Sequence, residues 1–325
     1  MNAPVIAFLG WDDRRTFLVY HLAWMYAELG YTVLVVDLDP QAGLTSSFLI
    51  EERRSELWLT PGEQERTIVE KLHYALFEET GGPDVHLEPV GDDVGSPGRL
   101  ILVPGDPSIV QLEDSFSRYW ARRGEISKTS TDPVHSLESL LRQIAGQQKA
   151  DLVLVDPGFY PSAIARAAWT TANFGIFAVS PDPLSVRVFE TFGTIVNSWR
   201  IGHFVAETQS EGYVVLSRPS RVDQPPSFLE TSLSLIPTIY QGNVLGKDVS
   251  GTSRLTPRED PNCLGILREA SGLLDTAREA QKPVFLLKPS DGAVGGLALA
   301  VQDAYRDFER LTLRIAGRVG LPPIP

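Results

Sequence analysis

The stretch that decides the fold is the segment 4–41. It reads, in order, PVIAFLG (4–10), WDDRRT (11–16), FLVYHLAWMYAELG (17–30), YTVLVV (31–36) and DLDPQ (37–41). The first and fourth pieces are apolar runs of strand length, the second is polar, and the third has apolar residues at helical spacing with a glycine at its end. The segment therefore predicts a β-α-β unit whose second strand ends at two carboxylates, Asp37 and Asp39.

Composition sets the broad class of the protein. The chain has 325 residues, of which 43% are hydrophobic, so it can bury a large core, and we expect a single α/β domain over 1–325. The formal net charge of −12 disfavours nucleic acid and anionic membranes as partners unless a local basic patch overrides it. A single cysteine, Cys263, excludes an internal disulfide and a cysteine-built zinc site. We expect a soluble, cytoplasmic protein without a membrane partner.

Strands and helices are expected to alternate along the rest of the chain. The apolar runs at 99–103, 151–155, 175–179 and 213–216 predict further strands. Helices are predicted over 67–77, 108–120, 135–148, 184–199, 227–235 and 295–318. This order predicts a doubly wound, mainly parallel sheet flanked by helices, with ligands beyond the carboxyl ends of the strands.

Two segments interrupt the alternation. Residues 78–98 are rich in Gly, Asp and Pro and are predicted to form a solvated loop. Residues 240–262 contain a Gly/Ser/Thr-rich stretch and are predicted to be an insertion or a flexible surface segment.

The segment 31–45 resembles the second nucleotide-site motif of the ParA/MinD (Soj-like) family of deviant Walker A P-loop ATPases. The residues that carry the resemblance are DLDPQ at 37–41 with Gly43 and Thr45. Three further stretches are similar to that family, LILVPGDPSIVQLE (100–113), VSPDPLSV (179–186) and the segment 282–293. The resemblance implies a P-loop NTPase fold, with ATP and magnesium as cofactors.

Alignment on that family assigns roles to the first loop. Arg15 falls on the phosphate-binding lysine, Thr16 on the magnesium-binding threonine and Arg14 on the last glycine of the loop. Gly10 falls on the signature lysine that reaches across the dimer, so the resemblance implies nucleotide contacts for Gly10, Arg14, Arg15 and Thr16.

The resemblance also implies roles for residues that follow later strands. Asp37 and Asp39 would be catalytic, and Asp156 would hold magnesium together with Thr16. Arg218 follows the strand 213–216, where the family places its adenine contacts.

The loop itself departs from the family pattern. Trp11 and Asp12 stand in place of two glycines, and Asp13 adds a further negative charge. A phosphate cradle needs glycines so that successive backbone N–H groups approach the anion closely. Two unit charges ~4 Å apart repel by about 4 kcal/mol at an effective dielectric constant near 20. These residues predict a degenerate loop that does not form an anion cradle.

The sequence leaves two functions open. One is a pseudo-ATPase that keeps the fold as a dimerising or partner-binding protein related to DNA partition and cargo-positioning systems. The other is an active partition or positioning ATPase with a remodelled, arginine-containing loop. Either protein would form a homodimer, or a heterodimer with a related subunit, and would bind a protein partner.

If magnesium is absent, the three carboxylates need another cation. Asp37, Asp39 and Asp156 would repel one another at the strand ends unless backbone groups or arginines neutralise them. Arg14 and Arg15 are the nearest candidates by position. The sequence therefore predicts an internal salt-bridge network in place of the metal.

The last predicted helix carries a basic stripe. Its arginines recur every four residues, at Arg306, Arg310, Arg314 and Arg318. The stripe predicts a DNA-binding surface; the alternative is a solvated face whose arginines pair with the neighbouring Asp303, Asp307 and Glu309.

Overall fold

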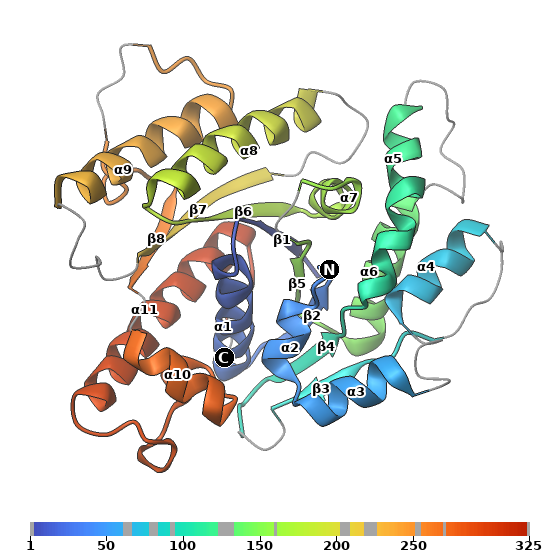
Figure 1. Cartoon of the computed structure of the whole chain (residues 1–325), viewed down its shortest axis with the longest axis horizontal. Helices are drawn as coiled ribbons and strands as arrows, with labels where there is room; N and C mark the ends of the chain where they lie inside the picture. The colour runs from blue at the N-terminus through green and yellow to red at the C-terminus, as the bar shows by residue number, and fades with distance from the viewer. Residues whose placement is uncertain are drawn as a thin grey trace.

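The centre of the molecule is an eight-stranded sheet with the strand order β3-β4-β2-β5-β1-β6-β7-β8 (Figure 1). The computed structural model describes residues 3–60, 67–77, 84–91, 95–122, 133–158, 161–201, 209–217, 226–250, 255–268 and 271–323. Neighbouring strands are parallel except for β3, which pairs with β4 in the antiparallel direction. Because helices cover the sheet, the predicted doubly wound α/β fold is confirmed.

The elements have the following bounds. The strands are β1 (Val5–Leu9), β2 (Thr32–Asp37), β3 (Glu88–Val90), β4 (Arg99–Val103), β5 (Leu152–Asp156), β6 (Phe174–Val179), β7 (Gln209–Ser217) and β8 (Cys263–Arg268). The α-helices are α1 (Arg14–Glu28), α2 (Gly43–Phe48), α3 (Glu51–Leu59), α4 (Ile68–Phe77), α5 (Glu113–Ala121), α6 (Pro133–Gln148), α7 (Ala163–Thr171), α8 (Pro183–Ile201), α9 (Pro226–Ile239), α10 (Ser271–Ala280) and α11 (Gly296–Val319). None of the described helices is long and apolar enough to cross a membrane.

The core lies on both faces of the sheet. In β2, Val33 and Val35 pack into one apolar cluster with α1 and α11, while Leu34 and Val36 pack into the other with α6 and α7. Successive side chains of a strand point to opposite faces, so a strand covered on both sides needs a continuous apolar run. That is why the strands 5–9, 32–36 and 151–155 could be recognised in the sequence.

Strand register brings the acidic residues together. Asp37 at the end of β2 lies directly opposite Asp156 at the end of β5, and the backbone N–H of Leu38 donates to the carbonyl oxygen of Asp156. The loop that follows β1 and the start of α1 lie at the same edge of the sheet (Figure 1). Both are therefore placed beside the two carboxylates, as the β-α-β unit predicts.

The structure contains β8 and α10, which the sequence analysis did not predict, and it differs from the prediction in both segments that were expected to interrupt the alternation. Within the predicted loop 78–98, Glu88–Val90 form the edge strand β3, which is too short to produce a recognisable pattern. At the start of the predicted flexible segment 240–262, Tyr240–Val244 continue α9 as a π-helical turn. Tyr240 and Val244 are fully buried beside α8, so this part is packed although it contains glycine and asparagine. That the rest of 240–262 is an insertion stays a prediction.

A buried histidine helps to attach α1 to the C-terminal part of the chain. The His21 ring stacks on Phe308 of α11, with ring centroids 5.0 Å apart. Its Nδ1 donates to the carbonyl oxygen of Phe17, and its Nε2 accepts from the backbone N–H of Val284. Burial lowers the pKa of His21 to about 3. The ring is therefore neutral, with both nitrogens satisfied.

His21 is expected to make the protein sensitive to acid. The unfolded chain protonates this histidine near pH 6.5 and the folded one only near pH 3, so the free energy of unfolding falls as the pH drops through this window. The loss is about 2 kcal/mol at pH 5. Urea unfolding at pH 7 and pH 5 gives the change in the free energy of unfolding for the wild type and for the control His21→Asn. The difference between the two proteins isolates His21, because all other titrating groups contribute equally to both. Equal pH dependence in the two proteins would contradict a neutral, buried His21.

Candidate functional site

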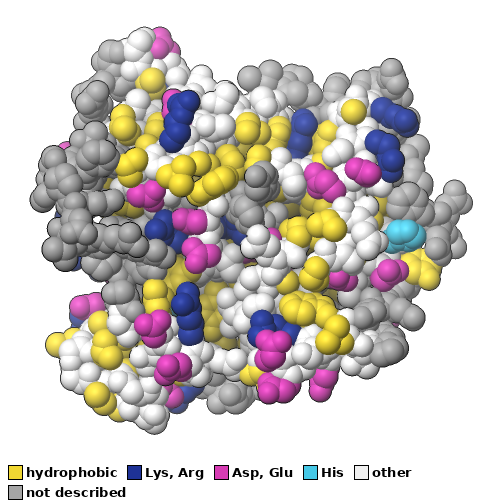
Figure 2. Space-filling view, in the orientation of Figure 1, with side chains coloured by type: hydrophobic (Ala, Val, Ile, Leu, Met, Phe, Trp, Pro, Cys, Tyr) yellow, Lys and Arg dark blue, Asp and Glu magenta, His cyan; other side chains and the backbone are white. Residues whose placement is uncertain are grey.

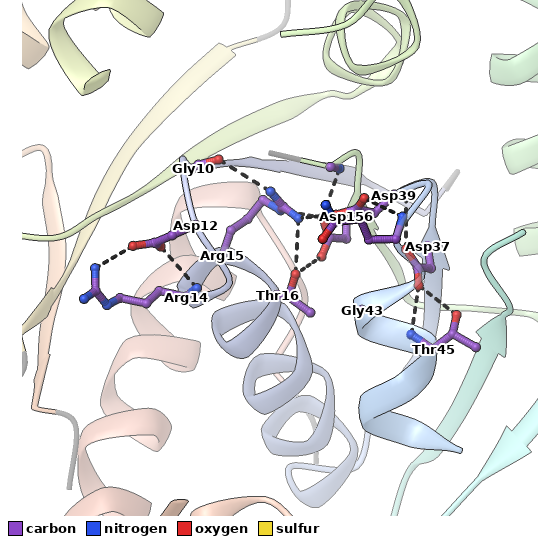
Figure 3. Close-up of polar contacts among 12 residues, drawn as sticks. Gly10, Asp12, Arg14, Arg15, Thr16, Asp37, Asp39, Gly43, Thr45 and Asp156 are labelled. Carbon is purple, nitrogen blue, oxygen red and sulfur yellow. Dashed lines mark hydrogen bonds and ion pairs between the residues drawn. The ribbon is translucent and has the colours of Figure 1, made fainter. Parts of the chain in front are cut away.

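The candidate site is built around one buried arginine at the carboxyl ends of β1, β2 and β5 (Figure 3). Arg15 Nε lies 2.5 Å from Asp156 Oδ1, and its Nη2 lies 2.9 Å from Asp39 Oδ2. The Arg15 side chain is only 1% exposed. Its guanidinium therefore holds two carboxylates of different strand ends inside the protein, where a charge without a partner is very costly.

Gly10 makes room for this arginine. A Cβ atom at Gly10 would stand 3.0 Å from Arg15 Cβ and 3.1 Å from the carbonyl oxygen of Ala178. Arg15 Nη1 also donates to the carbonyl oxygen of Gly10, at 3.4 Å. A larger residue at position 10 would therefore displace the loop or the arginine.

The residues predicted to hold magnesium bind one another. Thr16 Oγ1 donates to Asp156 Oδ2 at 2.7 Å and accepts from Arg15 Nη2 at 3.2 Å. Asp156 Oδ1 also accepts from the backbone N–H of Gly158. Both oxygens of Asp156 are thus engaged, and the described residues contain no group of three or more His, Cys, Asp or Glu side chains arranged for a metal ion. The arrangement does not fit Mg²⁺, because Arg15 fills the space between its expected ligands.

Asp37 connects β2 to the two segments beside it. Its carboxylate accepts from the backbone N–H of Asp39 and from both the backbone N–H and the hydroxyl of Thr45, at 2.7–3.1 Å. Thr45 Oγ1 in turn accepts from the backbone N–H of Gly105, which follows β4. Burial, and secondly the nearby charge of Asp156, raise the pKa of Asp37 to about 7. These contacts make Asp37 a structural link between β2, α2 and the loop after β4.

The first turn of α1 is occupied by the chain itself. Asp12 Oδ1 accepts a hydrogen bond from the backbone N–H of Arg14. The backbone carbonyl oxygen of Asp12 accepts one from the backbone N–H of Arg15. Asp12 Oδ2 lies 2.5 Å from Arg14 Nη1. A carboxylate therefore stands where an anion would meet the helix N-terminus, and it raises the cost of bringing in a phosphate. These contacts support the prediction that the loop forms no anion cradle.

The prediction of an arginine-neutralised acidic cluster is confirmed for Arg15 and is wrong for Arg14. The Arg14 guanidinium contacts Asp12, the hydroxyl of Ser180 and, at 3.6 Å, Asp182. Successive residues of a helix point about 100° apart, so only one of the two arginines faces the strand ends. Arg14 instead connects the first loop to the segment before α8, a contact that the sequence pattern did not indicate.

The basic stripe of α11 is divided into two halves. Arg306 pairs with Asp303 at 3.5 Å, and Arg310 with Asp307 at 3.6 Å. Arg314 donates to the carbonyl oxygens of Cys263 and Leu264, and Arg318 to that of Pro261. The first half matches the alternative of a solvated, paired face, and the second half contacts the chain at β8. DNA binding by the stripe stays a prediction, and Arg218 lies outside the described residues.

A cavity of about 450 Å³ opens beside the buried network. It is lined by Arg15, Thr16 and Asp39 from the site and by Arg278 and Lys282 from the region of α10. The sequence pattern did not indicate α10 as part of the site, because this helix reaches the cavity only through the tertiary fold.

The arrangement of sheet and helices is that of the ParA/MinD-like P-loop NTPase fold, and the solved structures similar to this chain include ParA and MinD proteins. Protein DIP2308 from Corynebacterium diphtheriae has a TM-score of 0.70 at 14% identity, covering 97% of this chain and 98% of that one. The ParA of pNOB8, bound to nonspecific DNA, has a TM-score of 0.60 at 14% identity, covering 98% and 99%. A chain of the MinC:MinD cell division complex of Aquifex aeolicus has a TM-score of 0.53 at 16% identity, covering 99% and 98%.

These similarities confirm the ParA/MinD-like fold that the sequence motifs predicted. No protein-family model and no curated protein matches the sequence. Identities of 14–16% establish the fold alone, so the activity has to be argued from the site.

Replacing Arg15 is expected to destabilise the protein strongly. Arg15→Ala leaves Asp39 and Asp156 buried without a cation, which costs about 3 kcal/mol or more in the free energy of unfolding. Arg14→Ala is the matched control, because it removes the same side chain from the neighbouring, more exposed position and should cost about 1 kcal/mol or less. Urea unfolding measures both variants. Similar losses in the two would show that Arg15 does not support the site.

Proposed function

We propose that this protein is a pseudo-ATPase that uses the ParA/MinD-like fold as a dimerising or partner-binding scaffold related to partition and positioning systems. The observation that carries the proposal is the Arg15 guanidinium between Asp39 and Asp156. It supplies the positive charge that a magnesium ion would otherwise bring to these carboxylates. Hydrolysis is lost because metal and guanidinium compete for the same oxygens.

The first loop supports the same proposal. The resemblance assigns to Gly10 the lysine that reaches across the dimer, and glycine has no side chain with which to replace it. Arg15 does not reproduce the phosphate-binding lysine either, because its planar guanidinium is already engaged with three side chains of the site. The chain thus has neither of the two basic groups that the family resemblance implies for the triphosphate.

Partner binding is the remaining use of such a fold. The similar proteins include a MinD-type chain in complex with MinC and a ParA on nonspecific DNA. We propose that this chain forms a homodimer or pairs with a related subunit, and that the complex binds a protein partner. Dimerisation would then be independent of nucleotide.

A remodelled nucleotide site is the second candidate, and the cavity beside Arg15 is what favours it. This cavity of about 450 Å³ has both basic and acidic lining residues and lies at the edge of the sheet where ligands of this fold class bind. Among the similar structures, a variant of McdA from Cyanothece is an ATP complex, and a putative plasmid partition protein from Borrelia burgdorferi is bound to AMPPNP. In this candidate Arg15 would leave the carboxylates when nucleotide enters.

Nucleotide titration distinguishes the two candidates. For the wild-type protein we expect no magnesium-dependent binding of ATP, ADP or GTP by calorimetry. The elution volume in size-exclusion chromatography should also be the same with and without nucleotide. A clear rise in melting temperature with magnesium and ATP together would favour the remodelled nucleotide site and overturn the pseudo-ATPase.

The competition between Arg15 and a metal can be tested on its own. In Arg15→Ala the freed carboxylates are expected to bind Mg²⁺, so millimolar Mg²⁺ should raise the melting temperature of the variant but not of the wild type. Mg²⁺ at ten times a millimolar dissociation constant stabilises the folded variant by about 1.4 kcal/mol, which raises its melting temperature by about 2 °C. Arg15→Ala/Asp156→Asn, which removes one ligand, is the control and should lose this response. An equal response in the wild type would show that the guanidinium does not exclude the metal.

A further inference from the structure

A second feature of the molecule is a groove between β8 and α11, whose lining includes Arg14 of α1 but not Arg15, Asp39 or Asp156. Its volume is about 1100 Å³. β8 is the edge strand of the described sheet, and α11 runs beside it and beside α1 (Figure 1). We use the name β8–α11 groove for this space, which is bounded by 257–268, by α11 and by the start of α10.

The lining of the β8–α11 groove is apolar at its base. Leu264, Leu267, Phe308 and Leu311 all contribute, and each is at most 4% exposed. Ala300 and Ala304 of α11 add small, half-buried side chains toward the opening. The apolar surface that a ligand could cover belongs to the half-buried Phe17, Ile266, Leu274, Ala300 and Ala304, and burying it contributes to binding.

The charged lining of the groove is mainly basic. Seven arginines line it against four carboxylates, in a chain whose net charge is −12. The basic residues are Arg14, Arg258, Arg268, Arg306, Arg310, Arg314 and Arg318. Figure 2 shows basic, acidic and apolar side chains interspersed over the face that it presents. The excess of arginine in the groove differs in sign from the net charge of the whole chain.

Four of these arginines have no carboxylate partner within 4 Å among the residues that the structure describes. Arg258, which precedes β8, and Arg268, the last residue of β8, are both exposed. Arg314 and Arg318 donate only to backbone carbonyl oxygens, at 2.7–3.2 Å. The carboxylates of Asp303 and Asp307, by contrast, already pair with Arg306 and Arg310. The groove thus keeps unneutralised positive charge for a ligand.

We propose that the β8–α11 groove binds an extended segment of a partner protein in which acidic and apolar side chains alternate. Carboxylates of the segment would pair with Arg258, Arg268 and the free N–H groups of Arg314 and Arg318. Its apolar side chains would rest on the half-buried apolar lining residues, such as Ile266, Leu274 and Ala304. In an extended chain successive side chains point to opposite sides. A segment with this alternation therefore directs its acidic side chains toward the arginines and its apolar side chains toward the apolar lining. The carbonyl oxygens of Cys263 and Leu264 on β8 already accept from Arg314, so the segment would be held through its side chains.

The lining favours a peptide over a nucleic acid. A duplex presents phosphates at its surface and would contact only the rim, leaving the apolar base of the groove uncovered. Two of the four arginines that the sequence assigned to DNA are already paired with aspartates. The charge of −12 on the chain also opposes a polyanion much more than a short peptide with a few carboxylates.

The test is a selection of random dodecapeptides displayed on phage against the full-length protein, followed by fluorescence anisotropy with the selected peptide. The enriched sequences are expected to alternate Asp or Glu with apolar residues. The matched comparison is the same peptide with glutamine and asparagine in place of its acids, which should bind about tenfold or more weakly. A 20-base-pair duplex is titrated in parallel.

Variants of the groove locate the binding. Arg258→Gln/Arg268→Gln should weaken peptide binding about tenfold, and Ala300→Glu, which places a negative charge at the opening, should weaken it further. The control Arg122→Gln/Arg187→Gln makes the same change of charge just after α5 and on α8, and should leave the affinity unchanged. Circular dichroism confirms that each variant is folded.

Three outcomes would overturn the proposal. The first is that no peptide is enriched, or that the enriched peptides lack acidic residues. The second is that the affinity is the same in wild type and in Arg258→Gln/Arg268→Gln. The third is that the duplex binds more tightly than the peptide and loses its affinity in the groove variants, which would assign the groove to nucleic acid. None of these outcomes bears on nucleotide binding at Arg15, so the test is independent of the proposed function.

Discussion

The ion pairs of Arg15 with Asp39 and Asp156 are the interaction on which the rest of this structure depends. A parallel sheet places the ends of β2 and β5 side by side, and in this chain both ends carry aspartates. Three buried carboxylates, Asp37, Asp39 and Asp156, cannot share such a small volume without donors or a cation. Hydrogen bonds from Thr45 and backbone groups satisfy Asp37, and Asp39 and Asp156 share the single positive charge of Arg15. Each of the three side chains thereby has a partner within the chain.

This arrangement also changes how the first loop relates to the rest of the fold. With Gly10 beneath Arg15 and Asp12 on the first turn of α1, the loop is held by contacts within the chain. A loop that waits for a phosphate would leave its N–H groups and its cation free. In this structure the backbone N–H groups of Arg14 and Arg15 and the Arg15 guanidinium already have partners within the chain. The proposed pseudo-ATPase rests on this engagement of the loop within the chain.

The sequence was sufficient for the fold because buried parallel strands impose continuous apolar runs, and the segments 5–9, 32–36 and 152–156 carry them plainly. It also placed Arg15 beside the acidic strand ends. It did not separate Arg14 from Arg15, because that difference depends on which way each side chain leaves the first turn of α1. It missed β3, whose three residues have no period to detect, and the buried turn at Tyr240–Val244, whose packing against α8 is a tertiary contact. Local pattern is informative where one element alone decides the structure, and it fails where two elements meet.

The two groups of arginines illustrate the same principle at the level of charge. Arg15 and the arginines of the β8–α11 groove belong to one acidic chain, yet their surroundings give them opposite roles. Arg15 is 1% exposed, and the cost of burying its charge is offset only because two carboxylates share the site with it. Arg258 and Arg268 remain in contact with water, which solvates their charge without any partner. A buried cation must therefore be neutralised by the fold itself, whereas an exposed cation beside an apolar groove stays available to a ligand. Burial, and not residue type, decides which arginines support the structure and which can recognise a partner.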